Sequence, residues 1–311
     1  MAQPRIRVLG SLNIDLVQRV PRMPRPGETL RAIDFQTFIG GKGANQACAA
    51  AKLGAVSEMA GCIGADVFGH QLMDELKAMG VDMSRVRTGQ LPSGTATILV
   101  LPDGENVIVI SSGANGEVSV PVAIDAVEDL RSGDILMCQL EIPLESVAAA
   151  MQQAYRQGVT TILDPAPACP LPGPLLHAVT ILTPNQTEAG MLLSKPAVES
   201  VSDARQAAAS LRQLGPRQVI LKLGEQGCLV SDGAETTWVP GFSVSAVDTT
   251  AAGDAFNGAL ATALTRGQSL LSAARFACAA AALSVTRHGA APSLACLAEV
   301  ESLLASHTST S

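Results

Sequence analysis

Asp254, in the first turn of a predicted helix, has the clearest catalytic potential of the side chains in this sequence. An apolar stripe over residues 256–264 repeats every four residues and predicts a helix that begins near Ala252. Ala251, Ala252 and Gly253 are small, so the first-turn N–H groups stay open to an anion, which the helix dipole also attracts. A carboxylate there would repel a bound phosphate, but it could accept the proton of a hydroxyl that attacks phosphorus. The alternative is that Asp254 only complements the helix dipole.

A second predicted helix opens on a glycine-rich segment, Gly40-Gly41-Lys42-Gly43-Ala44-Asn45-Gln46. The segment is not a Walker A loop, because Lys42 is followed by glycine and the G-x-x-x-x-G spacing is absent. Glycines at this point let the backbone approach a polar ligand closely. A purely structural turn would also explain them.

Polar side chains follow two predicted strands at their carboxyl ends. Asn13 and Asp15 follow the first strand, and Glu141 follows the strand over 135–140. Ligands of open α/β sheets collect at these ends. Together with Lys42 and Asn45, these residues supply the donors and acceptors that vicinal hydroxyls of a sugar require.

Two later segments allow both a structural and a functional interpretation. Asn185 is a natural N-cap and Glu188 stands three residues on, so a capping box explains both. The alternative is that they face a nucleotide phosphate and its Mg²⁺ shell. The glycine-rich segment 222–227 is predicted to be a turn between strands, and such turns are often only turns.

Short β-rich runs alternate with longer helical runs along the chain. This alternation predicts an α/β fold, a mostly parallel sheet with helices on both faces. The predicted strands span residues 6–9, 135–140, 161–163, 180–182 and 219–223, and the predicted helices span residues 43–53, 68–79, 144–157, 202–214, 252–266 and 269–285.

Two segments, about 16–38 and 94–112, interrupt this rhythm with alternating apolar patterns and the turn signals Pro26-Gly27 and Asp103-Gly104. They predict antiparallel hairpins that form a small inserted β lid, a dimer surface, or both. We expect a single α/β domain over residues 1–311, and a homodimer that forms through the lid strands.

The composition excludes several classes of partner. A net charge of −7 with no basic cluster argues against nucleic acid. The seven cysteines are scattered without a C-x-x-C pair, which favours buried thiols in a reducing compartment. The longest apolar run, 276–285, is too short to cross a membrane, and no signal-peptide pattern opens the sequence. We therefore expect a cytoplasmic protein.

Taken together, these motifs resemble the ribokinase family of sugar kinases over essentially the whole chain. The resemblance is carried by Asn13-x-Asp15, Pro26-Gly27-Glu28-Thr29, the 40–46 segment, Thr183-Pro184-Asn185-x-x-Glu188, Lys222-Leu223-Gly224-x-x-Gly227, the 248–254 segment, and Thr286-Arg287-His288-Gly289-Ala290-Ala291-Pro292-Ser293. It implies ATP-dependent phosphorylation of the primary hydroxyl of a pentose, with D-ribose the expected substrate and Mg²⁺ and a monovalent cation, K⁺, as cofactors.

The resemblance also implies a role for each matching position. Asp254 would be the base, and Ala251, Ala252 and Gly253 would form the anion hole. The sugar would be held by Asn13, Asp15, Gly41, Lys42, Gly43, Ala44, Asn45, Glu141 and Asp254. ATP would be held by Asn185, Glu188, Lys222, Leu223, Gly224, Glu225, Gln226, Gly227, Gly253, Asp254 and Cys278. K⁺ would lie among Asp248, Thr250, Ser284, Arg287, Gly289 and Ser293.

Several alternatives stay open. Lys222 stands where a threonine is common in the family, and it either reaches a phosphate or points into water. Cys278 stands where related kinases often have a polar residue near adenine. A salt bridge between Asp248 and Arg287 would replace the K⁺ site. The substrate could instead be 2-deoxyribose, fructose or a nucleoside, and a sugar-binding regulator without catalysis or a structural oligomerisation module are the hypotheses outside the kinases.

Overall fold

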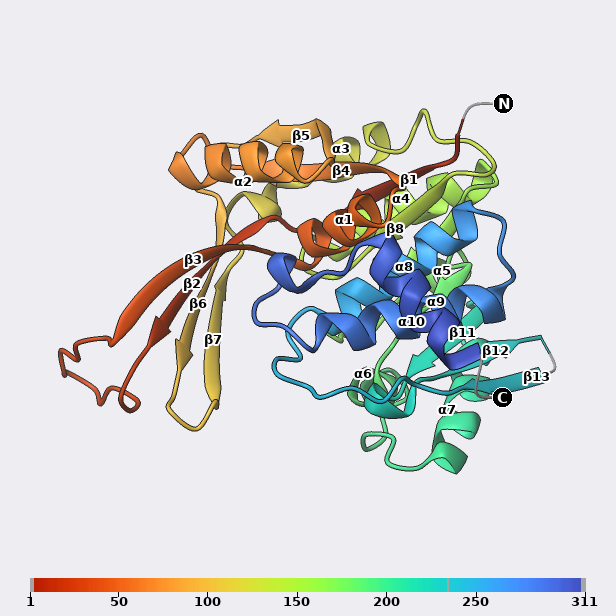
Figure 1. Ribbon diagram of the computed structural model, residues 1–311. Helices are drawn as coiled ribbons and strands as arrows, with labels where there is room; N and C mark the ends of the chain where they lie inside the picture. Colours follow the sequence, from red (N-terminus) through yellow and green to blue (C-terminus); the bar gives the residue numbers. More distant parts are fainter. Residues whose placement is uncertain (1–2, 234, 309–311) are drawn as a thin grey trace.

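A nine-stranded sheet runs through the centre of the computed structural model, which describes residues 3–233 and 235–308 (Figure 1). Its strand order is β13-β12-β11-β10-β9-β8-β1-β4-β5. The pairs from β11 to β5 are parallel, and β12 and β13 add an antiparallel edge. The strands are β1 (Arg5–Leu9), β4 (Val56–Ile63), β5 (Asp82–Thr88), β8 (Ile135–Cys138), β9 (Thr160–Leu163), β10 (Ile181–Leu182), β11 (Gln218–Lys222), β12 (Cys228–Asp232) and β13 (Glu235–Val239).

Helices cover both faces of this sheet, as predicted. One face carries α1 (Lys42–Lys52), α2 (Val67–Ala78), α8 (Ala252–Thr265), α9 (Leu270–Ser284) and α10 (Leu297–Thr308). The other carries α3 (Val120–Asp125), α4 (Leu144–Arg156), α5 (Gly173–Leu176), α6 (Gln186–Leu192) and α7 (Val201–Gln213). The six predicted helices are confirmed to within one residue at each end. Among the described residues, none of these helices has the length and apolar character needed to span a bilayer.

The packing of α1 against α8 positions the 40–46 and 248–254 segments, at which these two helices begin (Figure 1). Gly258 lies at their contact, where a Cβ would stand 2.5 Å from the Cβ of Ala49. Because α8 has no side chain at this point, the two helices approach closely. Their first turns, and therefore the 40–46 and 248–254 segments, are held together.

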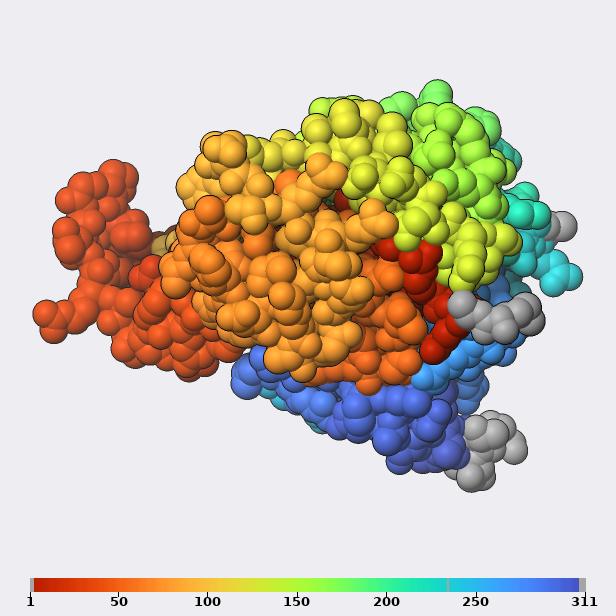
Figure 2. All heavy atoms as spheres, turned by 90° about the horizontal axis from the view of Figure 1, so that it is seen from above, coloured from red at the N-terminus to blue at the C-terminus, as the bar shows by residue number. Residues whose placement is uncertain are grey.

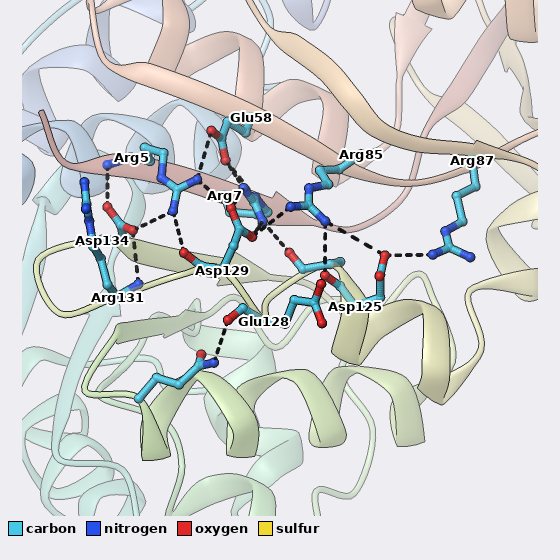
Figure 3. A network of polar contacts seen from close by, with 12 residues as sticks. Arg5, Arg7, Glu58, Arg85, Arg87, Asp125, Glu128, Asp129, Arg131 and Asp134 are labelled. Atoms are coloured by element: carbon cyan, nitrogen blue, oxygen red, sulfur yellow. Dashed lines mark hydrogen bonds and ion pairs between the residues drawn. The ribbon is translucent and has the colours of Figure 1, made fainter. Parts of the chain in front are cut away.

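Four strands of the central sheet, β4, β5, β12 and β13, were not predicted from sequence. In β4 and β5 the apolar pattern is broken by Glu58, Arg85 and Arg87. These charges are neutralised by a network of ion pairs, which Figure 3 shows. The network joins β4 and β5 to β1 and to the segment before β8. Arg7 of β1 is 1% exposed and binds both Glu58 and Asp129. The partners come from distant segments, so local pattern could not reveal these strands.

The predicted small sheet projects from the main body and contains β2 (Asn13–Arg19), β3 (Asp34–Gly40), β6 (Gly94–Val100) and β7 (Asn106–Ser111) (Figure 1). Its order is β3-β2-β6-β7. The two outer pairs are antiparallel, as predicted, whereas the central pair of β2 with β6 is parallel. The segment that leads into β3 extends furthest from the rest of the protein (Figure 2). Asn13, at the base of this sheet, lies opposite both Gly40 and Gly94.

Candidate active site

The first turn of α8 is open at its N-terminus, as the sequence predicts. Ala251 precedes the helix in the left-handed conformation, with φ 58°, and turns the chain into the first helical residue. A non-glycine residue in this region is uncommon and often marks a functional turn. The N–H groups of Gly253 and Asp254 point out of the helix end without intrahelical partners. This end of α8 can therefore bind an anion.

Asp254 is buried, 4% exposed, and both of its carboxylate oxygens are held by α1. The Asn45 Nδ2 donates to Oδ2 at 3.1 Å, and the Gln46 Nε2 donates to Oδ1 at 3.0 Å. Burial and the nearby Asp164 carboxylate raise the pKa of Asp254 to about 6, although Lys42 and the two amides lower it. A carboxylate with a pKa near neutrality is well suited to act as a general base.

The polar residues at the strand ends gather beside this carboxylate. Asn13 and Glu141 line a cavity of about 400 Å³, together with Ile110 and Ser112 of the small-sheet side. Burial, together with the charges of Glu141 and Asp254, raises the pKa of Asp15 to about 7. This electrostatic coupling means that the three carboxylates lie near one another.

The glycines of the 40–46 segment allow this crowding. A Cβ on Gly40 would lie 2.0 Å from the Asp15 Oδ1, and a Cβ on Gly43 would lie 2.7 Å from the Ser11 backbone. Gly41 has a φ of 86°, which strains any other residue. The structural interpretation of these glycines therefore holds, since the turn needs them in order to bring β2 and α1 together, and their role in binding a ligand stays a prediction.

Ser11 and Asn115, which were not predicted as site residues, bind two of the predicted sugar-site side chains. The Glu141 Oε2 accepts hydrogen bonds from the Ser11 Oγ at 2.5 Å and from the Lys42 N–H at 3.2 Å. The Asn115 Nδ2 donates to the Asn13 Oδ1 at 2.8 Å. Ala44 is buried and its N–H donates to the Ser11 carbonyl, so its own groups are occupied within the protein.

A second, larger cavity of about 920 Å³ has Asp254 in its lining. Both cavities have volumes typical of small-molecule sites, about 300–1,000 Å³. The larger one brings together predicted residues from five separate segments: Lys42, Asn185, Glu188, Lys222, Gly224, Glu225, Gln226, Gly227, Ala251, Ala252, Gly253, Asp254 and Cys278. It also includes residues that the sequence analysis missed: Asp164, Gly241, Phe242, Ser243, Val244, Ala246, Thr249, Phe256, Ala281, Ala282 and Val285.

Three of the predicted nucleotide-site residues have structural roles. Asn185 and Glu188 form the predicted capping box of α6, with both hydrogen bonds at 2.8 Å, and both also line the cavity. Leu223 is buried, 4% exposed, and packs in the core rather than lining the cavity. Cys278 lines the cavity with its Sγ 3.7 Å from the Sγ of Cys228.

Lys42 balances the negative charge of the site. Burial alone would lower its pKa, but the carboxylates of Asp254, Asp164, Glu141 and Glu188 outweigh burial and keep the pKa above its usual value. Burial raises the pKa of Glu188. Lys42 therefore stays cationic between the two cavities.

The residues predicted for K⁺ lie in the loop before α8, at the last residue of α9 (Ser284) and in the segment after α9. Asp248 accepts a hydrogen bond from Thr250 N–H and from Gly289 N–H, each at 2.9 Å, and thereby joins the two loops. Ser284 and Ser293 are buried, and each bonds a carbonyl three residues before it. The alternative of a salt bridge between Asp248 and Arg287 is wrong, because Arg287 pairs with Glu299 of α10.

The chain belongs to the pfkB family of carbohydrate kinases, whose family model matches residues 3–295. It is an ATP-dependent sugar kinase, as the resemblance implied. The ribokinase of Haemophilus influenzae is 42% identical over 290 residues, which cover 93% of this chain and 94% of that protein. The deoxyribokinase of Salmonella typhi is 38% identical over 287 residues, which cover 91% and 93%.

A solved structure gives the same result for the fold. The ribokinase of Arabidopsis thaliana, complexed with ribose and ATP, superposes with a TM-score of 0.88 at 35% identity, covering 98% of this chain and 99% of that one. The predicted α/β fold with its small inserted sheet is confirmed.

Proposed function

We propose that this protein transfers the γ-phosphoryl group of ATP to the primary hydroxyl of D-ribose, giving ribose 5-phosphate and ADP. The observation that carries the proposal is the position of Asp254. Its carboxylate stands at the open N-terminus of α8, lines the larger cavity, and acts electrostatically on Asp15 of β2. A base in this position lies beside an anion site and near Asp15, one of the polar residues expected to bind the sugar.

The chemistry follows from this placement. The sugar's 5-oxygen attacks the γ-phosphorus, a new O–P bond forms, and the bond from phosphorus to the β–γ bridging oxygen breaks as ADP leaves. Asp254 takes the hydroxyl proton on a carboxylate oxygen. The N–H groups of Gly253 and Asp254 receive the negative charge that develops on the phosphoryl oxygens.

The sugar would occupy the smaller cavity, which Asn13 and Glu141 line, and Asp15, Lys42 and Asn45 would add further acceptors and donors. ATP would occupy the larger one, with its base against the apolar side chains of Phe242, Val244 and Val285. Glu188 presents an oxygen ligand of the kind that Mg²⁺ prefers, and bound Mg²⁺ would neutralise phosphate charge.

A panel of acceptors tests the substrate. Coupled ADP release should be faster with D-ribose than with 2-deoxyribose, fructose or adenosine, each at the same concentration. Asp254→Asn is the control for a contaminating kinase, because activity that remains in this variant at the wild-type level would come from another enzyme. The deoxyribokinase relative makes 2-deoxyribose the second candidate, and preferential turnover of that sugar, of fructose or of adenosine would refute ribose as the substrate.

K⁺ is the proposed monovalent cofactor. Among the described residues Asp248 has no ion-pair partner, and the Ser284 and Ser293 hydroxyls and nearby carbonyls offer further oxygens of the kind a hard cation accepts. An ion held there would fix the backbone that leads into the anion site without touching either substrate. Activity in Tris buffer should rise when KCl replaces choline chloride at equal ionic strength, and Asp248→Asn should lose this response. Equal activity in the two salts would exclude the site.

The small sheet is the proposed dimer surface. β7 is an edge strand on which Val107, Ile108, Val109 and Ile110 are 43–61% exposed. Consecutive exposed apolar residues on a sheet edge are a liability unless another chain covers them. A second copy of this sheet would cover β7 and would place a lid over the sugar cavity, which Ile110 already lines.

A further inference from the structure

Lys222 is the last residue of β11, and its side chain extends toward the start of α8 rather than into water. Its Nζ lies 3.4 Å from the position that a Cβ on Gly253 would occupy. The side chain is only 13% exposed and lines the larger cavity. Because Gly253 has no side chain, the ammonium group stands directly beside the open first turn of the helix.

Asp164 holds this ammonium group in place. It follows β9, is 2% exposed, and lines the same cavity. Its Oδ1 accepts from the Lys222 Nζ at 3.0 Å, and its Oδ2 accepts from the Gln46 Nε2 at 3.0 Å. The ammonium group is therefore held by a buried carboxylate within the same cavity as the anion site.

Gln46 connects this pair to the catalytic base. Its Nε2 donates to both Asp164 and Asp254, and its Oε1 accepts from the Gln139 Nε2 at 2.7 Å. The amide nitrogen donates twice and the amide oxygen accepts once, which fixes the orientation of the group. A continuous chain of contacts thus runs from the Lys222 ammonium through Asp164 and Gln46 to the Asp254 carboxylate.

We propose that Lys222 is a further catalytic residue, whose ammonium group contacts the transferred phosphoryl group, and that Asp164 is the positioning residue that holds it there. The inference rests on the proposed phosphoryl transfer. Negative charge on the transferred group is shared over its outer oxygens, and a cation already held beside the helix N-terminus stabilises that charge without reorganising. Lys222 and the α8 N–H groups would then act on the same phosphoryl oxygens.

A purely structural ion pair is the competing explanation. A structural pair has no need to line a ligand cavity, and its two residues could be replaced together by neutral ones with little effect on turnover. The catalytic explanation predicts the opposite, because the positive charge itself is required. A double variant in which both residues are neutral therefore distinguishes the two explanations.

The experiment measures kcat and KM for both substrates in Lys222→Met, Asp164→Asn and the double variant, with Lys77→Met, an exposed lysine on α2, as the control. The assay uses the panel sugar that the wild-type enzyme turns over fastest. Lys222→Met should lose about 10²–10³-fold in kcat, the usual cost of removing one group that stabilises developing negative charge, with the sugar KM nearly unchanged. Asp164→Asn should lose less, because Lys222 is still present but less well held.

In the double variant kcat should stay at the level of Lys222→Met, since Asp164 acts through the lysine. Lys222→Arg, which can keep the ion pair and the charge, should recover part of the activity, and thermal melts confirm that each variant is folded. Wild-type turnover in Lys222→Met, or its return in the double variant, would overturn the proposal while leaving the kinase function intact. A wild-type enzyme that phosphorylates no acceptor would overturn both.

Discussion

At the scale of single residues, the site depends on a carboxylate whose surroundings change its proton affinity. Asp254 is buried beside Asp164, and these two effects raise its pKa to about 6 although Lys42 and two amides oppose them. The amides of Asn45 and Gln46 hold both oxygens, so the base is oriented before the substrate arrives. An ordinary aspartate, with a pKa of about 3.9, would be a weaker base.

This environment predicts the pH dependence of turnover. Asp254 must be deprotonated to accept the hydroxyl proton, so kcat should fall as the pH drops through about 6 and approach a plateau above it. Measuring kcat at saturating sugar and ATP removes the contribution of Asp15, whose pKa of about 7 should affect sugar affinity instead. Thermal melts at each pH control for unfolding. An acid limb near pH 4 would mean that the base is another group or that Asp254 is not shifted.

At the scale of elements, the site is assembled where the first turns of α1 and α8 meet. Gly258 permits this contact, and Asn45 and Gln46 of α1 then reach Asp254 of α8. The carboxyl ends of β8 and β9 add Glu141 and Asp164 from the same edge of the sheet.

Gly258→Ala tests this arrangement. The added Cβ would stand 2.5 Å from Ala49 and 2.8 Å from the Gln46 carbonyl, so α1 must move away from α8. Overpacking of this kind costs about 1–3 kcal/mol of stability. We expect a lower Tm and also a lower kcat, because the Gln46 amide moves with its helix. Gly173→Ala, where a Cβ meets nothing within 4 Å, is the control. A Gly258→Ala enzyme with wild-type Tm and kcat would show that the contact does not position the base.

The sequence predicted those parts of the site that local pattern encodes. Asp254 and the 40–46 segment were found because helix starts and glycines have local signatures. Asp164 stands directly after a predicted strand, as Glu141 does, so the same rule of strand ends could have identified it. Ser11 lies two residues after the first predicted strand, so the rule of strand ends applies to it as well. Asn115 gave no such signal, because it contacts Asn13 only when residues 102 positions apart pack together. The roles assigned to individual site residues remain predictions.

At the scale of the whole molecule, one nine-stranded sheet supports both cavities and the small sheet projects beyond it (Figure 1). The ion-pair network of Figure 3 joins β1, β4 and β5 to the segment before β8. The apolar side chains of β7 are left exposed at one edge of the small sheet in a single chain. A dimer would cover them.

Val109→Lys should separate that dimer. Val109 is 61% exposed on β7, and a lysine there would place a charge in the proposed interface. Sedimentation velocity at micromolar concentration should show a dimer for the wild type and a monomer for this variant. Val67→Lys on α2, where the valine is 72% exposed, should remain dimeric. A wild-type monomer, or a Val109→Lys dimer, would contradict the assignment of this surface.

The most direct test of the whole account is the identity of the product. D-ribose and ATP are incubated with the wild-type enzyme and, in parallel, with Asp254→Asn, and the mixtures are followed by phosphorus NMR. The account predicts one new phosphomonoester whose phosphorus couples to the protons on carbon 5, with ADP in equal amount. It also predicts that Asp254→Asn forms this product at least about 10²-fold more slowly. Phosphate on another hydroxyl, ADP formed with free phosphate only, or equal rates for the two enzymes would contradict it.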